Sequence, residues 1–238
     1  MDSSPRPIRR TAPARPASIR RSLLSCTVAL AATGLVGGFA PAAQAAPEDG
    51  PSAPAAAPDP IEPFARYQPQ STCDPAAKPG TSALATLLLD HYDMGRNGGI
   101  SRNCSIGGRS EHKEGRAFDW MLSVDRSNER ATAEQFIDWL LDEGPDGEDA
   151  YNARRLGVMY VIWNRRIWSA DHASRGWLRY RGPNPHVSHI HISLTWSGAM
   201  QQTSFWTGVA ADVGQGSSGE DPATGDDDHD HDHEEDDD

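Results

Sequence analysis

The sequence lacks three features that would each indicate a class of protein. Outside the first 45 and the last 19 of its 238 residues, it carries 16 basic and 21 acidic residues, so it has no basic patch large enough for nucleic acid. It contains no internal repeat. Its longest apolar run, residues 23–40, is short for a membrane span and is interrupted by Thr and Gly. The sequence therefore favours neither a nucleic-acid-binding protein nor a membrane-embedded one.

The formal net charge of −12 is unevenly distributed along the chain. Residues 1–45 carry six Arg and one Asp, whereas residues 220–238 carry twelve acids and no base. Within the first segment an Arg pair at 20–21 precedes the apolar run, and an Ala-Gln-Ala sequence at 43–45 is typical of a cleavage site. We therefore predict a signal peptide over residues 1–45 and a secreted protein, with both the general and the twin-arginine export routes open.

Composition divides the rest of the chain into three segments. Residues 46–69 are rich in Pro and Ala, which favours an extended linker. Residues 70–212 contain the periodic apolar patterns and are expected to form one domain of ordinary size. Residues 213–238 pass from Gly and Ser into alternating Asp and His and cannot bury a core. We predict a disordered acidic tail there, whose His and Asp side chains could also gather divalent ions weakly.

The sequence contains three cysteines, and their positions indicate whether they form a disulfide. Signal cleavage would remove Cys26 and leave Cys73 and Cys104. An even pair in an exported protein favours a disulfide, which would stabilise the fold by roughly 3–4 kcal/mol on the chain-entropy model. Free thiols or zinc ligation are the alternatives, but neither cysteine has a Cys or His partner at zinc-finger spacing.

Apolar periodicity predicts two helices and three main strands. Thr81 can cap a helix that ends at Tyr92, and a second helix is expected over residues 128–141. The expected strands are Arg116–Leu122, Gly157–Trp163 with a short partner through Trp168 after a turn at Asn164-Arg165, and Val187–Trp196. Helices and short strands in irregular order indicate an α+β fold, with a small, mainly antiparallel sheet and flanking helices.

Histidines and acids gather in two short motifs. These are Ser110-Glu111-His112-Lys113-Glu114-Gly115-Arg116-Ala117-Phe118-Asp119 and His189-Ile190-His191. Side chains two residues apart on a strand share a face, so His189 and His191 should point to one side. Two imidazoles and one carboxylate could hold a zinc ion and leave a fourth position for water, which zinc acidifies into a nucleophile.

The residues around the first motif support this arrangement. On a strand, Asp119 shares its face with the small residue Ala117, which leaves room for an ion and a substrate. Gly115 allows the loop that carries His112 to fold back over the strand. Ser110 could hydrogen-bond a ligand and hold its orientation. We therefore expect the metal site on one face of the sheet.

These motifs resemble a known family. Ser-x-His-x-x-Gly-x-Ala-x-Asp followed by His-x-His is the signature of the LAS-type zinc metallopeptidases, which comprise lysostaphin-type enzymes, D-alanyl-D-alanine carboxypeptidases and the hedgehog signalling domain. Residues 110–119 look most like the D-alanyl-D-alanine carboxypeptidase branch, and the resemblance spans about 82–196. It implies a zinc ion bound by His112, Asp119 and His191.

The resemblance also implies a general acid/base. His189 falls where one branch of the family places this residue, and an imidazole of near-neutral pKa can take a proton from water and return it to a leaving amine. The chain departs from the branch that has a Glu just before the last His ligand, because residues 181–190 contain no carboxylate. Glu111 and Glu114 are weaker alternatives, and Glu114 is expected to be a solvated loop residue.

For several other side chains the sequence allows either a role in the site or a structural role. Arg102 matches roughly where the family has an arginine for the substrate carbonyl or carboxylate, and its charge could stabilise an oxyanion. An exposed surface position fits Arg102 equally well, and Arg109 is the alternate candidate. His186 is either a pocket-edge group or a structural hydrogen-bonding one. Four tryptophans could line a groove, although in a sheet they more often form the core: Trp120, Trp163, Trp168 and Trp177.

The resemblance and the predicted export together imply a function. We expect a secreted, cell-wall-associated zinc peptidase that hydrolyses amide bonds in peptidoglycan peptides, as a carboxypeptidase or an endopeptidase. The expected partner is that peptide substrate, without nucleic acid or stable membrane insertion after signal cleavage, and we expect a monomer. The alternative is a non-catalytic zinc-containing domain that binds the cell wall or signals, as in the hedgehog relatives.

A two-histidine phosphoesterase is a further alternative. The sequence His191-Ile192-Ser193-Leu194 fits one half of the motif of that class. Its only partner, the sequence at 172–175, lacks the apolar residue that should follow.

Overall fold

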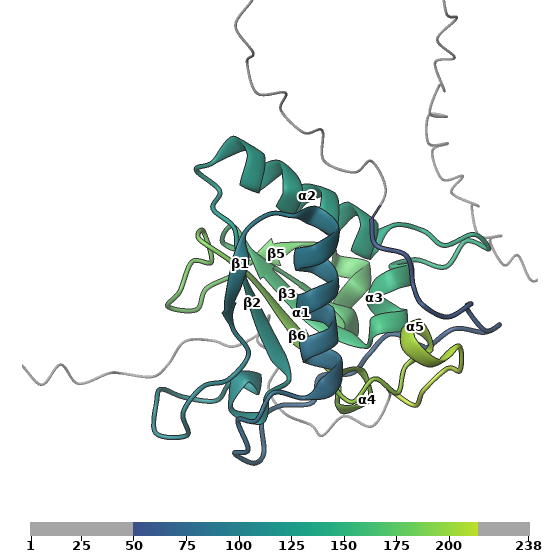
Figure 1. Ribbon diagram of the computed structural model, residues 1–238, viewed down its shortest axis with the longest axis horizontal. Helices are drawn as coiled ribbons and strands as arrows, with labels where there is room; N and C mark the ends of the chain where they lie inside the picture. The colour runs from purple at the N-terminus through teal and green to yellow at the C-terminus, as the bar shows by residue number, and fades with distance from the viewer. Residues whose placement is uncertain (1–49, 214–238) are drawn as a thin grey trace, which may run out of the picture. The chain divides into compact units, whose positions relative to one another are not determined.

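The computed structural model describes residues 50–213. The predicted signal peptide and residues 214–238 of the predicted tail lie outside these residues. The strands are β1 (Arg96–Gly99), β2 (Ala117–Met121), β3 (Val158–Trp163), β4 (Arg166–Ser169), β5 (Leu178–Arg179) and β6 (Ile190–Leu194). Within the described part they form one antiparallel sheet in the order β1-β2-β6-β3-β4-β5 (Figure 1). The predicted α+β fold with an antiparallel sheet is confirmed.

The α-helices cover one face of this sheet (Figure 1). The α-helices are α1 (Pro79–Tyr92), α2 (Ser127–Leu141), α3 (Tyr151–Leu156), α4 (Trp196–Ala199) and α5 (Ser204–Thr207), and the 3-10 helices are η1 (Glu111–Glu114) and η2 (Ala170–Arg175). Trp120 of β2 packs against Tyr92 of α1 and Phe136 of α2, with ring centroids 5.4 and 5.6 Å away. None of the helices between residues 50 and 213 is long and apolar enough to cross a membrane.

Local sequence explains most of the element boundaries. α1 begins at Pro79, because the fixed φ of proline suits the first helical position and its missing N–H is not needed there. The predicted cap at Thr81 is therefore wrong, and Thr81 lies buried inside the first turn. Asn164 and Arg165 both have positive φ, 47° and 62°, which is typical of a two-residue turn between antiparallel strands and confirms the predicted hairpin.

The alternation along β2 separates the core from the opposite face. Phe118 and Trp120 are fully buried under the helices, so Asp119 between them points away from the helices. Three of the four tryptophans with an open role, Trp120, Trp163 and Trp168, are buried in the core. Trp177 is half-buried. The side of the sheet opposite the helices is therefore the one available for polar side chains.

The segment 50–69, whose composition favours an extended linker, packs on the domain. Ile61 is buried, and the fully buried Glu62 accepts hydrogen bonds from the Ser204 N–H and hydroxyl, both at 2.6 Å, and from the Ala211 N–H at 3.0 Å. Composition did not indicate this packing, because proline and alanine content reflects only local backbone preference. The contacts are made with residues about 140 positions away in the sequence.

Cys73 and Cys104 form the predicted disulfide, across 31 residues of sequence. Replacing both with Ser should lower the free energy of unfolding by about 3–4 kcal/mol, because the open chain has more conformational entropy to lose. Urea unfolding of the protein and of the double Ser variant, under non-reducing conditions, measures this difference. A loss well below 1 kcal/mol would contradict the expectation.

Candidate metal site

Two strands and one 3-10 helix bring the three predicted ligands together. Asp119 on β2 and His191 on β6 are direct cross-strand partners, on the face away from the helices. η1 carries His112, and Gly115, with a φ of 63°, ends η1 and returns the chain into β2. One ligand atom from each of these three residues lies within 4.8 Å of the other two.

The three ligand atoms form a small triangle. His112 Nε2 is 3.2 Å from Asp119 Oδ1 and 3.3 Å from His191 Nδ1, and His191 Nδ1 is 2.9 Å from Asp119 Oδ1. Burial opposes ionisation of Asp119, but its hydrogen bonds with the two imidazoles outweigh burial and hold the pKa of the carboxyl well below its usual range. Asp119 is therefore an anion, which is the form that binds metal.

Outer hydrogen bonds set which nitrogen of each histidine faces this triangle. His112 Nδ1 lies 2.9 Å from the Ile100 carbonyl, and His191 Nε2 lies 2.9 Å from the Ser193 hydroxyl. When these outer N–H groups donate and the inner nitrogens give up their hydrogen bonds to Asp119, the two inner lone pairs and the carboxylate oxygen all face the centre of the triangle. Three converging acceptors suit a cation between them, so this group could hold a metal ion.

Sequence reasoning gave the orienting role to Ser110, whereas the structure gives it to Ser193 and Ile100. Ser110 instead donates its backbone N–H to the Gln70 side chain at 2.9 Å. The signal for Ser193 was present, because it lies two residues after His191 and so shares its strand face. The carbonyl of Ile100 carried no such signal, since it depends on the path of a loop.

The ligand group opens into a cavity of about 520 Å³. His189, Arg102 and Arg109 all line this cavity. His189 Nε2 is 3.8 Å from Asp119 Oδ1. Burial lowers the pKa of His189. The charge of Asp119 opposes this effect, and His191, His112 and Arg102 add to it in decreasing order. The imidazole of His189 is therefore predominantly neutral at neutral pH and able to accept a proton.

Two more side chains support the ligands from the cavity wall. Tyr160 of β3 stacks on His191, with ring centroids 5.5 Å apart and planes 16° apart, and its hydroxyl donates to Glu111. Sequence reasoning missed Tyr160. His186 has a positive φ of 49°, and its Nδ1 lies 2.6 Å from the Asn184 carbonyl. Burial lowers the pKa of His186 to about 3, so it is a neutral group that both lines the cavity and makes a structural hydrogen bond.

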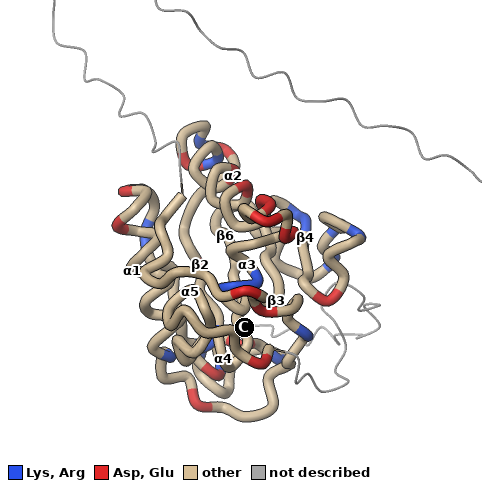
Figure 2. The backbone as a smooth tube through the Cα atoms, turned by 90° about the vertical axis from the view of Figure 1, so that its right-hand side faces the viewer, with Lys and Arg blue, Asp and Glu red and all other residues tan. Residues whose placement is uncertain are grey.

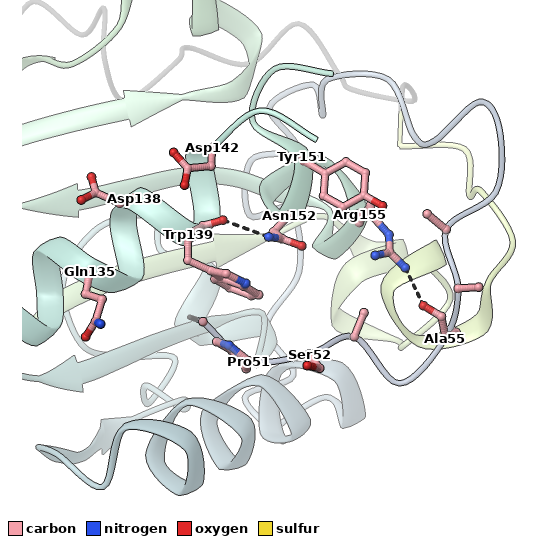
Figure 3. Close-up of a pocket in the computed structure, with 14 residues that line it drawn as sticks. Pro51, Ser52, Ala55, Gln135, Asp138, Trp139, Asp142, Tyr151, Asn152 and Arg155 are labelled. Atoms are coloured by element: carbon pink, nitrogen blue, oxygen red, sulfur yellow. Dashed lines mark hydrogen bonds between the residues drawn. The ribbon is translucent and has the colours of Figure 1, made fainter. Parts of the chain in front are cut away.

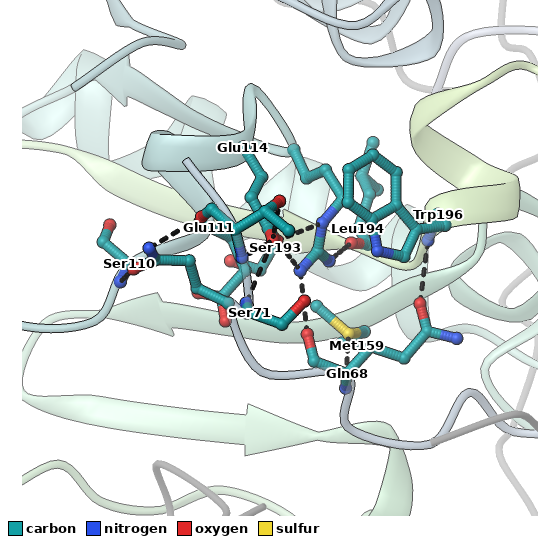
Figure 4. Close-up of polar contacts among 12 residues, drawn as sticks. Gln68, Ser71, Ser110, Glu111, Glu114, Met159, Ser193, Leu194 and Trp196 are labelled. Carbon is teal, nitrogen blue, oxygen red and sulfur yellow. Dashed lines mark hydrogen bonds and ion pairs between the residues drawn. The ribbon is translucent and has the colours of Figure 1, made fainter. Parts of the chain in front are cut away.

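The prediction that Glu114 is a solvated loop residue is wrong. Glu114 and Arg116 are fully buried, and Oε2 of Glu114 accepts from Nη2 of Arg116 at 2.5 Å (Figure 4). Oε1 of Glu114 accepts from the N–H groups of Ser71 and Thr72 at 3.0 and 2.9 Å. Arg116 also donates to the Leu194 carbonyl at 2.7 Å. The carboxylate of Glu114 therefore holds the η1 turn in place and has no free lone pair for proton transfer.

A second cavity, of about 580 Å³, lies between the segment 50–57 and helices α2 and α3. Arg155 donates to the Ala55 carbonyl there at 2.8 Å, and Asn152 donates to the Trp139 carbonyl at 2.9 Å (Figure 3). None of the predicted ligand or catalytic residues lines it. Of its polar side chains, Arg155 attaches the amino-terminal segment, and its lining contains no histidine. The smaller cavity beside the His and Asp group is therefore the candidate site.

The family model described as VldE, C-terminal domain, matches residues 73–191, which is half of the 238-residue chain. The chain belongs to this family. The part that matches the VldE C-terminal domain begins at Cys73 and ends at His191, so it contains the disulfide and all three candidate ligands. No curated protein and no solved structure matches the chain.

Proposed function

We propose that the protein is a secreted zinc-dependent peptidase that hydrolyses amide bonds in the peptides of cell-wall peptidoglycan. The observation that carries the proposal is the convergence of His112, Asp119 and His191 beside an open cavity. The substrate class comes from the resemblance of residues 110–119 and 189–191 to the LAS-type peptidases. The location comes from the predicted signal peptide and is compatible with the disulfide.

The distances between the ligand atoms support zinc. Zinc bonds of about 2.0–2.1 Å in a tetrahedral site place neighbouring ligand atoms about 3.3 Å apart. The three distances in the triangle are 2.9, 3.2 and 3.3 Å. Two imidazoles and one carboxylate, with room for water, are a donor set that catalytic zinc sites use. When bound there, zinc would acidify a water molecule and polarise the scissile carbonyl.

The remaining chemistry falls to residues of the cavity wall. His189 accepts a proton on its imidazole from the attacking water and returns it to the leaving amine, which needs that proton to depart. The low pKa of His189 keeps the imidazole ready to accept. Arg102 is half-buried in the same wall and presents a fixed positive charge to the carbonyl oxygen or to a substrate carboxylate.

Replacing His189 with Ala should keep the metal and lose catalysis. Loss of a general acid/base typically costs about 10²–10⁴-fold in rate, whereas all three ligands remain. Metal content and hydrolysis rate, measured on the same preparation, separate the two effects. His172→Ala is the matched control, because His172 does not line the cavity. A His189→Ala variant as active as its parent would assign the proton transfer to another group.

Digestion of purified peptidoglycan tests the function itself. Mass spectrometry of the products distinguishes removal of a terminal residue from cleavage within a peptide. Stoichiometric zinc without release of amines at any pH would favour the non-catalytic zinc domain instead. Hydrolysis of phosphate esters that survives chelation would favour the two-histidine phosphoesterase, which the position of His172 outside the cavity does not support.

A further inference from the structure

One edge of the sheet carries an unusual concentration of arginines. Residues 165–181, which include β4, η2 and β5, contain five arginines and one acid. All five are exposed, and Figure 2 shows positive residues gathered around β4. We call this group the arginine edge: Arg165, Arg166, Arg175, Arg179 and Arg181.

The charges of the arginine edge are not neutralised within the described part of the chain. No carboxylate between residues 50 and 213 forms an ion pair with any of the five. Arg166 and Arg179 are direct cross-strand partners, and like charges in opposite positions destabilise a sheet. The one acid in this stretch, Asp171, accepts the backbone N–H of Tyr67 at 2.7 Å. An anion over the edge would relieve the repulsion between the arginines.

The chain itself contains a segment of complementary charge. Residues 220–238 carry twelve acids and no base. Arginine pairs well with carboxylates because its planar guanidinium donates several parallel hydrogen bonds. Exposed ion pairs are individually weak, so only a segment that offers many carboxylates at once can be held by such an edge.

The described chain ends close to the arginine edge. The carbonyl of Val213, the last described residue, accepts the Arg66 N–H at 3.3 Å. The N–H of Tyr67, which follows Arg66, donates to Asp171 between β4 and β5, the strands that carry Arg166 and Arg179. The thirteen residues from Val213 to Asp226 can span up to about 45 Å, more than the roughly 40 Å width expected of a domain of this size. Chain length therefore allows the acidic segment to reach all five arginines.

We propose that residues 220–238 dock on the arginine edge of the same chain. The edge adjoins the candidate cavity, because the Asn164 and Arg165 N–H groups donate to the His186 and Pro185 carbonyls at 2.8 and 2.9 Å. The docked segment lies beside the cavity rim and shields the arginines from external polyanions. This proposal does not depend on the proposed peptidase activity.

Nuclear magnetic resonance of the arginine side chains in the full mature chain tests the proposal. The variant for comparison replaces every Asp and Glu of residues 220–238 with Asn and Gln. At low salt the Nε–Hε resonances of the edge arginines should differ between the two proteins, and the difference should vanish at high salt because the charges are screened. Arg126 and Arg130 of the α2 region, which pair with Glu129 and Glu134, are the controls and should not change.

Binding of inorganic polyphosphate identifies the occupant of the edge. If the acidic segment covers the arginines, the neutralised variant should bind polyphosphate several-fold more tightly than the natural chain. Substituting Arg165→Gln and Arg179→Gln in the neutralised variant should remove most of that gain. Identical arginine resonances in the two proteins at low salt would overturn the proposal. Equal polyphosphate affinity of the two proteins would also overturn it and would assign the edge to an external polyanion.

Discussion

Changing Asp119 to Asn should remove zinc from the purified protein. The substitution keeps the size of the side chain but deletes the only anionic ligand of the candidate group. Loss of an outer partner of a ligand already costs about 10–100-fold in metal affinity, so loss of the ligand itself should cost more than about 100-fold. Competition with a chromophoric chelator gives the affinity, and elemental analysis gives the bound metal. Peptide hydrolysis should fall with zinc occupancy.

A matched control separates this effect from a change in net charge. Asp125→Asn makes the same chemical change at an exposed position after β2 and should leave zinc binding unaltered. Thermal unfolding of both variants without metal checks that each still folds. If Asp119→Asn binds zinc as tightly as the parent, the His112, Asp119 and His191 group is not the metal site, and the proposed mechanism is lost with it.

Changing Glu114 to Gln should destabilise the fold by about 3–5 kcal/mol, the range for breaking one side of a buried ion pair. Both side chains of the Glu114–Arg116 pair are fully buried, so the substitution leaves the guanidinium without a counter-charge in a region that water does not reach. It also exchanges an acceptor of the Ser71 and Thr72 N–H groups for a weaker one. Urea unfolding measures the difference.

The pKa of Glu114 determines how the difference in the free energy of unfolding between the parent and Glu114→Gln changes with pH. Burial raises the pKa of Glu114, but hydrogen bonds from Arg116, Ser71 and Thr72 outweigh burial, so the folded-state pKa lies below the ordinary value of 4.5. The contribution to stability is therefore complete above that value and is lost as the pH falls through the folded-state pKa. The gap between the parent and Glu114→Gln should stay constant from neutral to mildly acidic solution and shrink only in stronger acid.

A surface pair on α2 provides the control for Glu114→Gln. Glu134 lies 4.0 Å from Arg130, and both side chains are largely exposed. Glu134→Gln should change the free energy of unfolding by less than about 1 kcal/mol. Equal effects of the two substitutions would mean that the Glu114–Arg116 pair is solvated in solution.

The candidate site could be predicted from sequence wherever its geometry follows from strand periodicity. Asp119 lies opposite the core-facing Phe118 because side chains alternate along β2. His189 directly precedes β6, and it lines the same cavity as His191 within β6. The order β2-β6-β3 needs long-range pairing, which no local pattern contains, so the contact between His191 and Tyr160 was not foreseen. The motif resemblance thus supplied the three ligands and strand periodicity gave the face on which Asp119 lies, but neither indicated the Tyr160 side of the cavity.

Loop residues were the main failure because their surroundings depend on distant segments. Glu114 follows His112 in a polar stretch, and nothing nearby indicates burial. Its environment is created by Arg116 together with Ser71 and Thr72, which approach from about 40 residues earlier in the sequence. The edge strand β1 was missed for a related reason, since its glycines look like a helix terminator and pair only when β2 lies alongside.

The buried carboxylate of Glu62 determines where the autonomously folding unit can be trimmed. A fragment that started at Gln70, where the composition changes, would leave the Ser204 amide and hydroxyl without the acceptor that now satisfies both. The same truncation would also remove the buried side chain of Ile61. The minimal stable fragment therefore starts upstream of Ile61, and the proline-rich stretch acts as a strap across the carboxyl-terminal helices.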